Sequence, residues 1–109
     1  MDQLKYQDCI DACNRCADAC DHCSVACLSE ENVAMMARCI RLDMDCAALC
    51  RFTAGALARD SEHAAQICRL CADICEACAK ECEKHDHDHC KACAKACRDC
   101  AKACRDMAA

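Results

Sequence analysis

Cysteine recurs along this chain at alternating steps of three and four residues, in four separate groups. The steps are 4-3-4-3-4 in the first group, 7-4 in the second, and 3-4-3-4 in the third and fourth. Residues spaced in this way share one face of an α-helix, and no other regular structure gives the rhythm. The pattern therefore predicts four helices whose inward-facing positions, here called the Cys seam, are nearly all cysteine. The groups are Cys9, Cys13, Cys16, Cys20, Cys23 and Cys27; Cys39, Cys46 and Cys50; Cys68, Cys71, Cys75, Cys78 and Cys82; and Cys90, Cys93, Cys97, Cys100 and Cys104.

Polar segments between the groups mark where the helices end. Residues 29–32 (SEEN) and 60–62 (DSE) offer caps and first-turn acids, and residues 83–89 (EKHDHDH) separate the last two groups. Short connections place successive helices antiparallel. We therefore predict an all-α fold, a single domain over 1–109 that forms an antiparallel up-down-up-down four-helix bundle with a cysteine-lined core. The expected helices cover about 3–28, 31–58, 61–84 and 87–106.

The amino-acid composition favours helical structure and argues against some classes of binding partner. The chain has no Pro, a single Gly and very few strand-forming residues. A net charge of −5, without a basic run or an aromatic platform, argues against nucleic acid. The first residues, MDQLKYQDCIDAC, are polar and acidic, so we expect neither a signal peptide nor a membrane span. The expected location is cytoplasmic, where thiols stay reduced.

Three roles for the cysteines fit poorly with this pattern. Cysteine buries little apolar area, so 19 of them would make a weak core on their own. Neighbours three or four apart on a helix have Cβ atoms about 5–6 Å apart, whereas a disulfide needs about 3.8 Å. The C-x2-C-x2-C spacing of bacterial iron–sulfur proteins never occurs. The interpretation that fits the pattern best is that the cysteines bind soft metal ions as thiolates.

Charge favours Cu(I) among the soft metals. Zn²⁺ held by four thiolates carries a net charge of −2, which is costly to repeat along a dry interior. Cu⁺ selects thiolates and, at about one ion per cysteine, leaves the interior neutral. A linear S–Cu–S unit would span roughly 4.6 Å, taking the zinc–sulfur length as a guide. The function we expect is storage of multiple Cu(I) ions, and the alternatives are a general zinc, cadmium or silver buffer and a thiol redox protein.

The two ends of the predicted bundle carry different residues. Extending the seams brings Met35, His85, His87 and His89 to one end, the histidine end, where thioether and imidazole can bind incoming Cu(I). A chaperone or small thiol is the expected donor. The tyrosine end is predicted to be closed by apolar groups, namely Tyr6, Thr53 or Leu57, Ala64 and Met107. No acid–base pair or separate nucleophile is present, so we expect no enzyme activity.

A second apolar stripe lies away from the seam on two of the helices. It is either ordinary packing or, as we favour, an interface between copies of the chain. Its members are Val33, Met36, Ile40, Met44 and Ala47 on the second helix and Ile67, Leu70 and Ile74 on the third.

The segments CIDACNRCADACDHCSVAC and CKACAKACRDCAKAC resemble the four-helix-bundle copper storage proteins of bacteria, and the likeness covers nearly the whole chain. Because we expect no export signal, the chain resembles the cytosolic branch of that family rather than the exported one. The resemblance implies a homotetramer of bundles, each holding about one Cu(I) per cysteine. It also implies a copper-admitting end that contains His and Met, which Met35 and residues 85–89 would provide.

Overall fold

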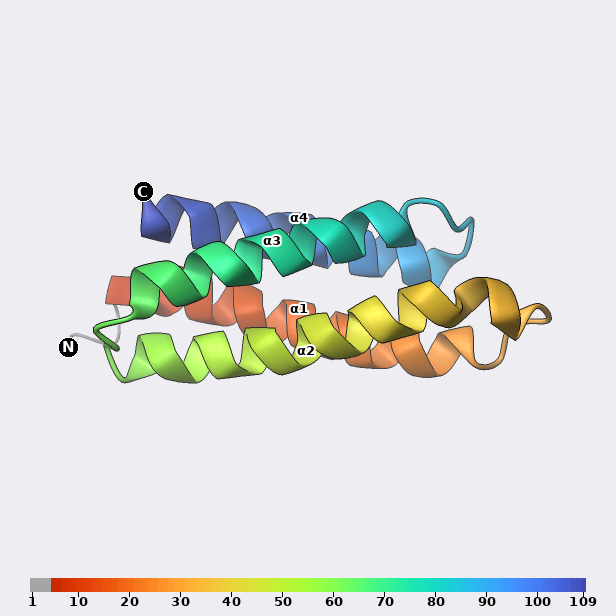
Figure 1. The fold of residues 1–109 in the computed structure, drawn as a ribbon, viewed down its shortest axis with the longest axis horizontal. Helices are drawn as coiled ribbons and strands as arrows, with labels where there is room; N and C mark the ends of the chain where they lie inside the picture. The colour runs from red at the N-terminus through yellow and green to blue at the C-terminus, as the bar shows by residue number, and fades with distance from the viewer. Residues whose placement is uncertain (1–4) are drawn as a thin grey trace.

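The computed structural model describes residues 5–109, and four long antiparallel helices account for most of them (Figure 1). The elements are α1 (Gln7–Cys27), the short 3₁₀ helix η2 (Val33–Met36), α2 (Ala37–Ala58), α3 (Ala64–Cys82) and α4 (Asp88–Ala108). Helix α1 packs against α2 and α4, and α3 packs against the same two helices. The predicted all-α four-helix bundle is confirmed. No helix within residues 5–109 is both long and apolar enough to span a bilayer.

The helices start later than the sequence pattern suggested. The predicted start of the first helix, at residue 3, lies outside the described residues. Helix α3 begins at Ala64 rather than at residue 61 because the end of α2 extends through a tight cap. There, Asp60 adopts a left-handed φ of 54°, and Ser61 N donates to Ala56 O at 3.0 Å. This is the Schellman arrangement, with Asp at the position that usually holds Gly.

The start of the second helix corrects one predicted position. We placed Met35 on the Cys seam because it lies four residues before Cys39. Met36 is the buried residue, at 2% exposure, whereas Met35 is 65% exposed. Residues 33–36 form a 3₁₀ turn, which has three residues per turn, so the α-helical phase counted back from Cys39 does not hold there.

The proposed apolar stripe divides between the core and the surface. On α2, Met36 and Ala47 are buried, and Ile40 packs partly against the core. Met44, in contrast, is 60% exposed, and Leu70 on α3 is also exposed. The stripe therefore contributes to packing within one bundle and leaves several apolar side chains at the surface.

Ion pairs join neighbouring helices on the outside of the bundle. Arg51 of α2 donates to Asp18 and Asp21 of α1 at 3.0 and 2.9 Å. Arg105 of α4 donates to Asp73 of α3 at 2.9 Å. Exposed pairs of this kind contribute about 0–1 kcal/mol each. Their main effect is to fix how the helices of each pair are aligned, and thus how the cysteines face one another.

Candidate metal centre

All 19 cysteines are buried, and none is in a disulfide. Eighteen have no solvent-exposed surface, and the other, Cys9, is 5% exposed. They lie on all four helices and point into the bundle, where small residues such as Ala17, Ala72 and Ala79 allow the helices close together. The interior is therefore a continuous column of sulfur atoms.

Neighbouring sulfur atoms of this column lie in contact, both along a helix and between helices. Along a helix, Cys23 Sγ and Cys27 Sγ are 3.9 Å apart. Between helices, Cys39 Sγ and Cys82 Sγ are 3.6 Å apart. A linear S–Cu–S unit of roughly 4.6 Å is longer than these contacts. Three sulfurs around one ion, at bonds of about 2.3 Å, would lie about 4 Å from each other, so shared three-coordinate sites fit better.

Groups of four thiols occur repeatedly along the column. In each group, all sulfur atoms lie within 4.8 Å of one another, close enough to share ions. Successive groups have cysteines in common, so neighbouring groups can share ligands to a bound ion. Three overlapping groups are Cys16, Cys46, Cys50 and Cys75; Cys16, Cys20, Cys46 and Cys97; and Cys20, Cys78, Cys93 and Cys97.

Asp43 is a buried member of the site that our sequence analysis missed. It has no exposed surface, and its Oδ1 accepts hydrogen bonds from the thiols of Cys78 at 3.1 Å and Cys93 at 3.3 Å. Cys39 donates to its Oδ2 at 3.8 Å. The spacing held the clue, since Asp43 divides the gap of seven between Cys39 and Cys46 into steps of four and three. An oxygen ligand therefore interrupts the sulfur column on α2.

The Asp43 carboxyl is neutral in the copper-free chain at neutral pH. Burial, reinforced by the neighbouring sulfurs of Cys93 and Cys78, raises its pKa to about 10. Within residues 5–109 it forms no ion pair that would offset this effect. The group can lose its proton when a cation arrives, and it then offers an anionic oxygen beside four thiols, since Cys82 Sγ also lies 3.7 Å from Oδ1.

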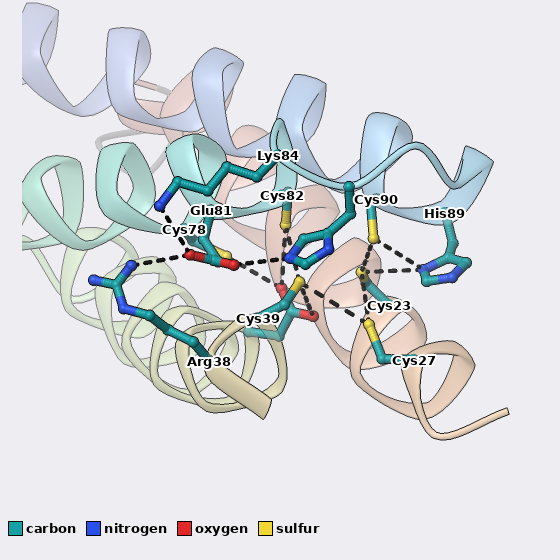
Figure 2. Close-up of polar contacts among 12 residues, drawn as sticks. Cys23, Cys27, Arg38, Cys39, Cys78, Glu81, Cys82, Lys84, His89 and Cys90 are labelled. Atoms are coloured by element: carbon teal, nitrogen blue, oxygen red, sulfur yellow. Dashed lines mark hydrogen bonds and ion pairs between the residues drawn. The ribbon is translucent and has the colours of Figure 1, made fainter. Parts of the chain in front are cut away.

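His89 connects the sulfur column to the histidine end (Figure 2). Its Nδ1 lies 3.3 Å from Cys23 Sγ and 3.6 Å from Cys90 Sγ, and these two sulfurs are 3.9 Å apart. Its Nε2 lies 2.7 Å from Glu30 Oε2. One nitrogen of the ring thus lies beside two thiols, and the other is hydrogen-bonded to a carboxylate from the α1–α2 connection. Burial raises the pKa of the Cys90 thiol to about 11, so it is protonated before metal binds.

His87 and His85 lie near the same end with different partners. The His87 ring stacks on His89, with centroids 5.4 Å apart, and its Nδ1 lies 3.4 Å from Glu30. His85 Nε2 is 2.8 Å from Glu81, which also pairs with Arg38 at 3.0 Å. Burial opposes ionisation of Glu81, but these hydrogen bonds outweigh it and lower its pKa. His85 is therefore engaged by a carboxylate rather than by a thiol.

A hollow of about 550 Å³ lies outside these groups at the histidine end. Met35 and Met36 line it together with Glu30, His85 and His87. The structure therefore brings the predicted histidines and Met35 to one end. Among these four residues, His89 is the one whose ring nitrogen lies within hydrogen-bond distance of seam thiols.

The opposite end is closed on one side. Thr53 and Leu57 of α2 are fully buried there, and Ala64 of α3 is nearly so. Tyr6 and Met107 are only partly buried. The predicted apolar plug is therefore complete on the α2–α3 side and thinner on the α1–α4 side.

Comparisons with known proteins agree with this geometry. Residues 2–109 match the family described as copper storage protein. The Cu(I)-bound copper storage protein BsCsp3 is 54% identical, with a TM-score of 0.91 over 95% of this chain and 99% of that one. A cytosolic copper storage protein from Streptomyces lividans is 43% identical, with a TM-score of 0.93 over 98% and 94%.

A curated relative extends the likeness to an uncharacterised protein. The cysteine-rich protein YhjQ of Bacillus subtilis is 55% identical over 65 residues, which is 60% of this chain. The match spans about half of the relative's length, at 54%. Taken with the thiol column and the family match over nearly every residue, these findings show that the chain belongs to the copper storage protein family.

Proposed function

We propose that this chain stores Cu(I) as thiolates of its seam cysteines, at about one ion per cysteine. The observation that carries the proposal is the column of 19 free, buried thiols with sulfur contacts of 3.6–4.0 Å across the helices. Cu(I) is the cargo named for the BsCsp3 relative, and we extend it to this chain. The ligands we propose are all the cysteines of the seam, with His89 and Asp43 as nitrogen and oxygen donors.

Charge balance favours a monovalent cargo. When a thiol takes Cu(I) from a donor thiolate, the donor receives the proton, so R–SH and Cu–SR′ become R–S–Cu and HS–R′. The interior stays neutral at one ion per cysteine. Among residues 5–109, no buried Lys or Arg would offset the −2 charge of each tetrathiolate site of a divalent ion. The cargo therefore replaces protons without adding buried charge.

Copper would first meet the protein at the histidine end. We propose that His89 Nδ1 and the sulfurs of Cys23 and Cys90 form the first three-donor site, because their separations of 3.3–3.9 Å approach the edge of a trigonal site. Glu30 fixes the ring so that Nδ1 faces these sulfurs. Met35 and His87 line the outer hollow, where they can bind an ion before it passes inward.

The surroundings of this function are part of the same proposal. We infer a cytosolic chain that receives Cu(I) from a chaperone or a small thiol and turns over no substrate. We further infer a homotetramer, supported by the exposed apolar side chains Val33, Met44 and Leu70. Light scattering should give four times the chain mass of 11.9 kDa, and a monomer mass would contradict the tetramer.

A second candidate is a buffer for divalent soft metals. The four-thiol groups have sulfur separations close to the roughly 3.8 Å edge of a zinc tetrathiolate. Such an ion would saturate the chain at about one per four cysteines, and the unbalanced negative charge would grow with each ion.

An anaerobic titration of the reduced chain with Cu(I), against a chromophoric competing chelator, tests the proposal. We expect tight binding that saturates near 19 ions, one per cysteine. Saturation after only a few Cu(I) ions, together with tighter binding of Zn²⁺ in a parallel titration, would replace copper storage with the divalent buffer. Conversion of the thiols to disulfides by mild oxidant, with loss of both metals, would favour a redox role.

A further inference from the structure

The α1–α4 side of the tyrosine end leaves one cysteine in contact with solvent. Cys9, in the first turn of α1, is 5% exposed, whereas every other cysteine of the seam is at 0%. The histidine of this end, His63, precedes α3 in the connection on the α2–α3 side. The one seam cysteine that keeps exposed surface therefore lies at the tyrosine end, whereas His89 lies over the fully buried cysteines of the histidine end.

Cys9 lines a hollow of about 350 Å³. Tyr6 and Met107 form part of its wall together with the charged residues Lys5, Asp8 and Asp106. Cys9 Sγ is 3.8 Å from Cys104 Sγ, which is 3.9 Å from Cys13 Sγ. Cys9 is thus the outermost sulfur of a connected cluster rather than an isolated cysteine.

We propose that this hollow is a second exchange site, at which a small external thiol removes Cu(I) from Cys9. The inference rests on the proposed storage function and concerns how copper leaves. Thiolate-bound Cu(I) exchanges when a new soft ligand reaches the ion, and ions held by fully buried thiols are out of reach. Copper on Cys9 is the exception, because Cys9 alone among the seam cysteines keeps exposed surface and lines a hollow.

The exchange involves ligand substitution and no redox change. An incoming thiol R–SH binds the copper, the Cu–S bond to Cys9 breaks, and the proton of the incoming thiol passes to the Cys9 sulfur. The products are Cu–SR and a free Cys9 thiol, with copper remaining Cu(I). Copper can then move from Cys13 to Cys104 and on to Cys9, because each sulfur in this series lies within 4 Å of the next.

The size of the hollow limits what can use it. A space of about 350 Å³ admits a small thiol, and a folded protein cannot reach through it to a residue that is only 5% exposed. The acceptor we infer is therefore a low-molecular-weight thiol. Protein donors would be confined to the wider histidine end.

Alkylation of the copper-free protein tests the accessibility on which the proposal rests. The reduced, unmodified chain is treated anaerobically with less than one equivalent of iodoacetamide, and the labelled cysteines are mapped by mass spectrometry. We expect most of the first label on Cys9. First labelling of Cys23, Cys27 or Cys90, at the histidine end, would overturn the proposal.

Release kinetics test the exchange itself. The fully loaded Cys9→Ser variant is compared with Cys68→Ser, which removes a fully buried neighbour of Cys9 at the same end and loses the same number of thiols. With mercaptoethanol as acceptor and a chromophoric chelator as readout, we expect Cys9→Ser to release its first copper several-fold more slowly. Equal rates in the two variants would overturn the exchange site.

Two further outcomes separate this inference from the storage proposal. Failure of the wild-type chain to bind Cu(I) overturns storage itself, whatever the labelling pattern. Full copper capacity combined with equal release from both variants overturns only the exchange site. Circular dichroism confirms that each variant is helical, and Cys9→Ala replaces Cys9→Ser if the serine variant is not.

Discussion

The two ends of the bundle differ in which atoms separate the sulfur column from solvent. At the histidine end, Glu30, His87 and His89 cover thiols that are themselves fully buried. At the tyrosine end, Thr53 and Leu57 close the α2–α3 side, and Cys9 lines a hollow on the α1–α4 side. The histidine end thus places imidazoles over the column, whereas the tyrosine end brings one of its cysteines to the surface.

The difference follows from the path of the chain. Two connections, residues 28–36 and 83–87, cross the histidine end and supply its polar ligands. A single connection, residues 59–63, crosses the tyrosine end, where α1 begins and α4 ends (Figure 1). Cys9 lies between these two helix termini, on the side that no connection within residues 5–109 crosses. An up-down-up-down bundle has this asymmetry whenever its four helices are of similar length.

Copper loading should have the largest effect, because it links both ends into one bonded column. Each site that binds only the folded chain adds about 4 kcal/mol at a ligand concentration of 1,000 Kd. We expect the melting temperature of the fully loaded chain, followed anaerobically by circular dichroism, to exceed that of the copper-free chain by at least about 20 °C. An unchanged midpoint would contradict an internal store, and Mg²⁺, which thiolates do not select, serves as the control ion.

Asp43 should give the copper-free chain an unusual pH dependence that originates near the histidine end. Its pKa is raised from 3.8 to about 10, so between these values the folded chain holds a proton that the unfolded chain releases. The unfolding free energy should therefore fall as pH rises, by up to about 1.4 kcal/mol per pH unit. Urea unfolding of the reduced protein between pH 5 and 8 measures this slope.

Two variants separate the Asp43 effect from general charge effects. Asp43→Asn keeps a neutral group in place and should flatten the dependence between pH 5 and 8. Asp45→Asn, at an exposed neighbouring position, is the matched control and should leave the slope unchanged. The same slope in wild type and Asp43→Asn would mean that the carboxyl is already ionised in the folded chain.

The smallest predicted effect concerns the rate of uptake at the histidine end. Without the hydrogen bond that the Glu30 carboxylate accepts from Nε2, the His89 ring is no longer held with Nδ1 toward Cys23 and Cys90. We expect Glu30→Gln to slow Cu(I) uptake several-fold in stopped-flow experiments while the final capacity stays the same. Glu31→Gln, on the adjacent exposed residue, should behave as wild type.

If Glu30→Gln loses copper capacity as strongly as it loses uptake rate, the Glu30 carboxylate would instead be needed to hold stored copper. His89→Ala should slow uptake further than Glu30→Gln, and His22→Ala, at an exposed position on α1, provides its control. Unchanged rates in both Glu30→Gln and His89→Ala would place copper uptake elsewhere on the bundle.

The sequence predicted the parts of this molecule that depend on helical phase alone. Steps of three and four assign each cysteine to the interior without reference to any other helix, and every one of them is buried. The same arithmetic would have included Asp43, but a carboxylate at an inward position is normally rejected because burial is costly. What makes it tolerable are thiols of Cys78 and Cys93, and these come from other helices.

Two other features depend on structure that spacing does not encode. Met36 replaces Met35 in the core because one turn is 3₁₀ rather than α-helical. The residues of this turn would fit either type of helix, so the sequence does not distinguish them. The exposure of Cys9 depends on how far Tyr6 and Met107 reach across a helix end. Both concern helix termini, where side-chain reach and local backbone geometry outweigh periodicity.

The sulfur contacts between helices also bear on how long each chain persists. Cysteine is a small side chain, so the empty column holds the four helices together with little apolar area. Copper shared between cysteines of different helices replaces those contacts with bonds that must break before the helices can separate. We expect proteases, which cut opened chains, to remove empty copies sooner than filled ones. The abundance of the protein would then follow the supply of its cargo without any change in its synthesis.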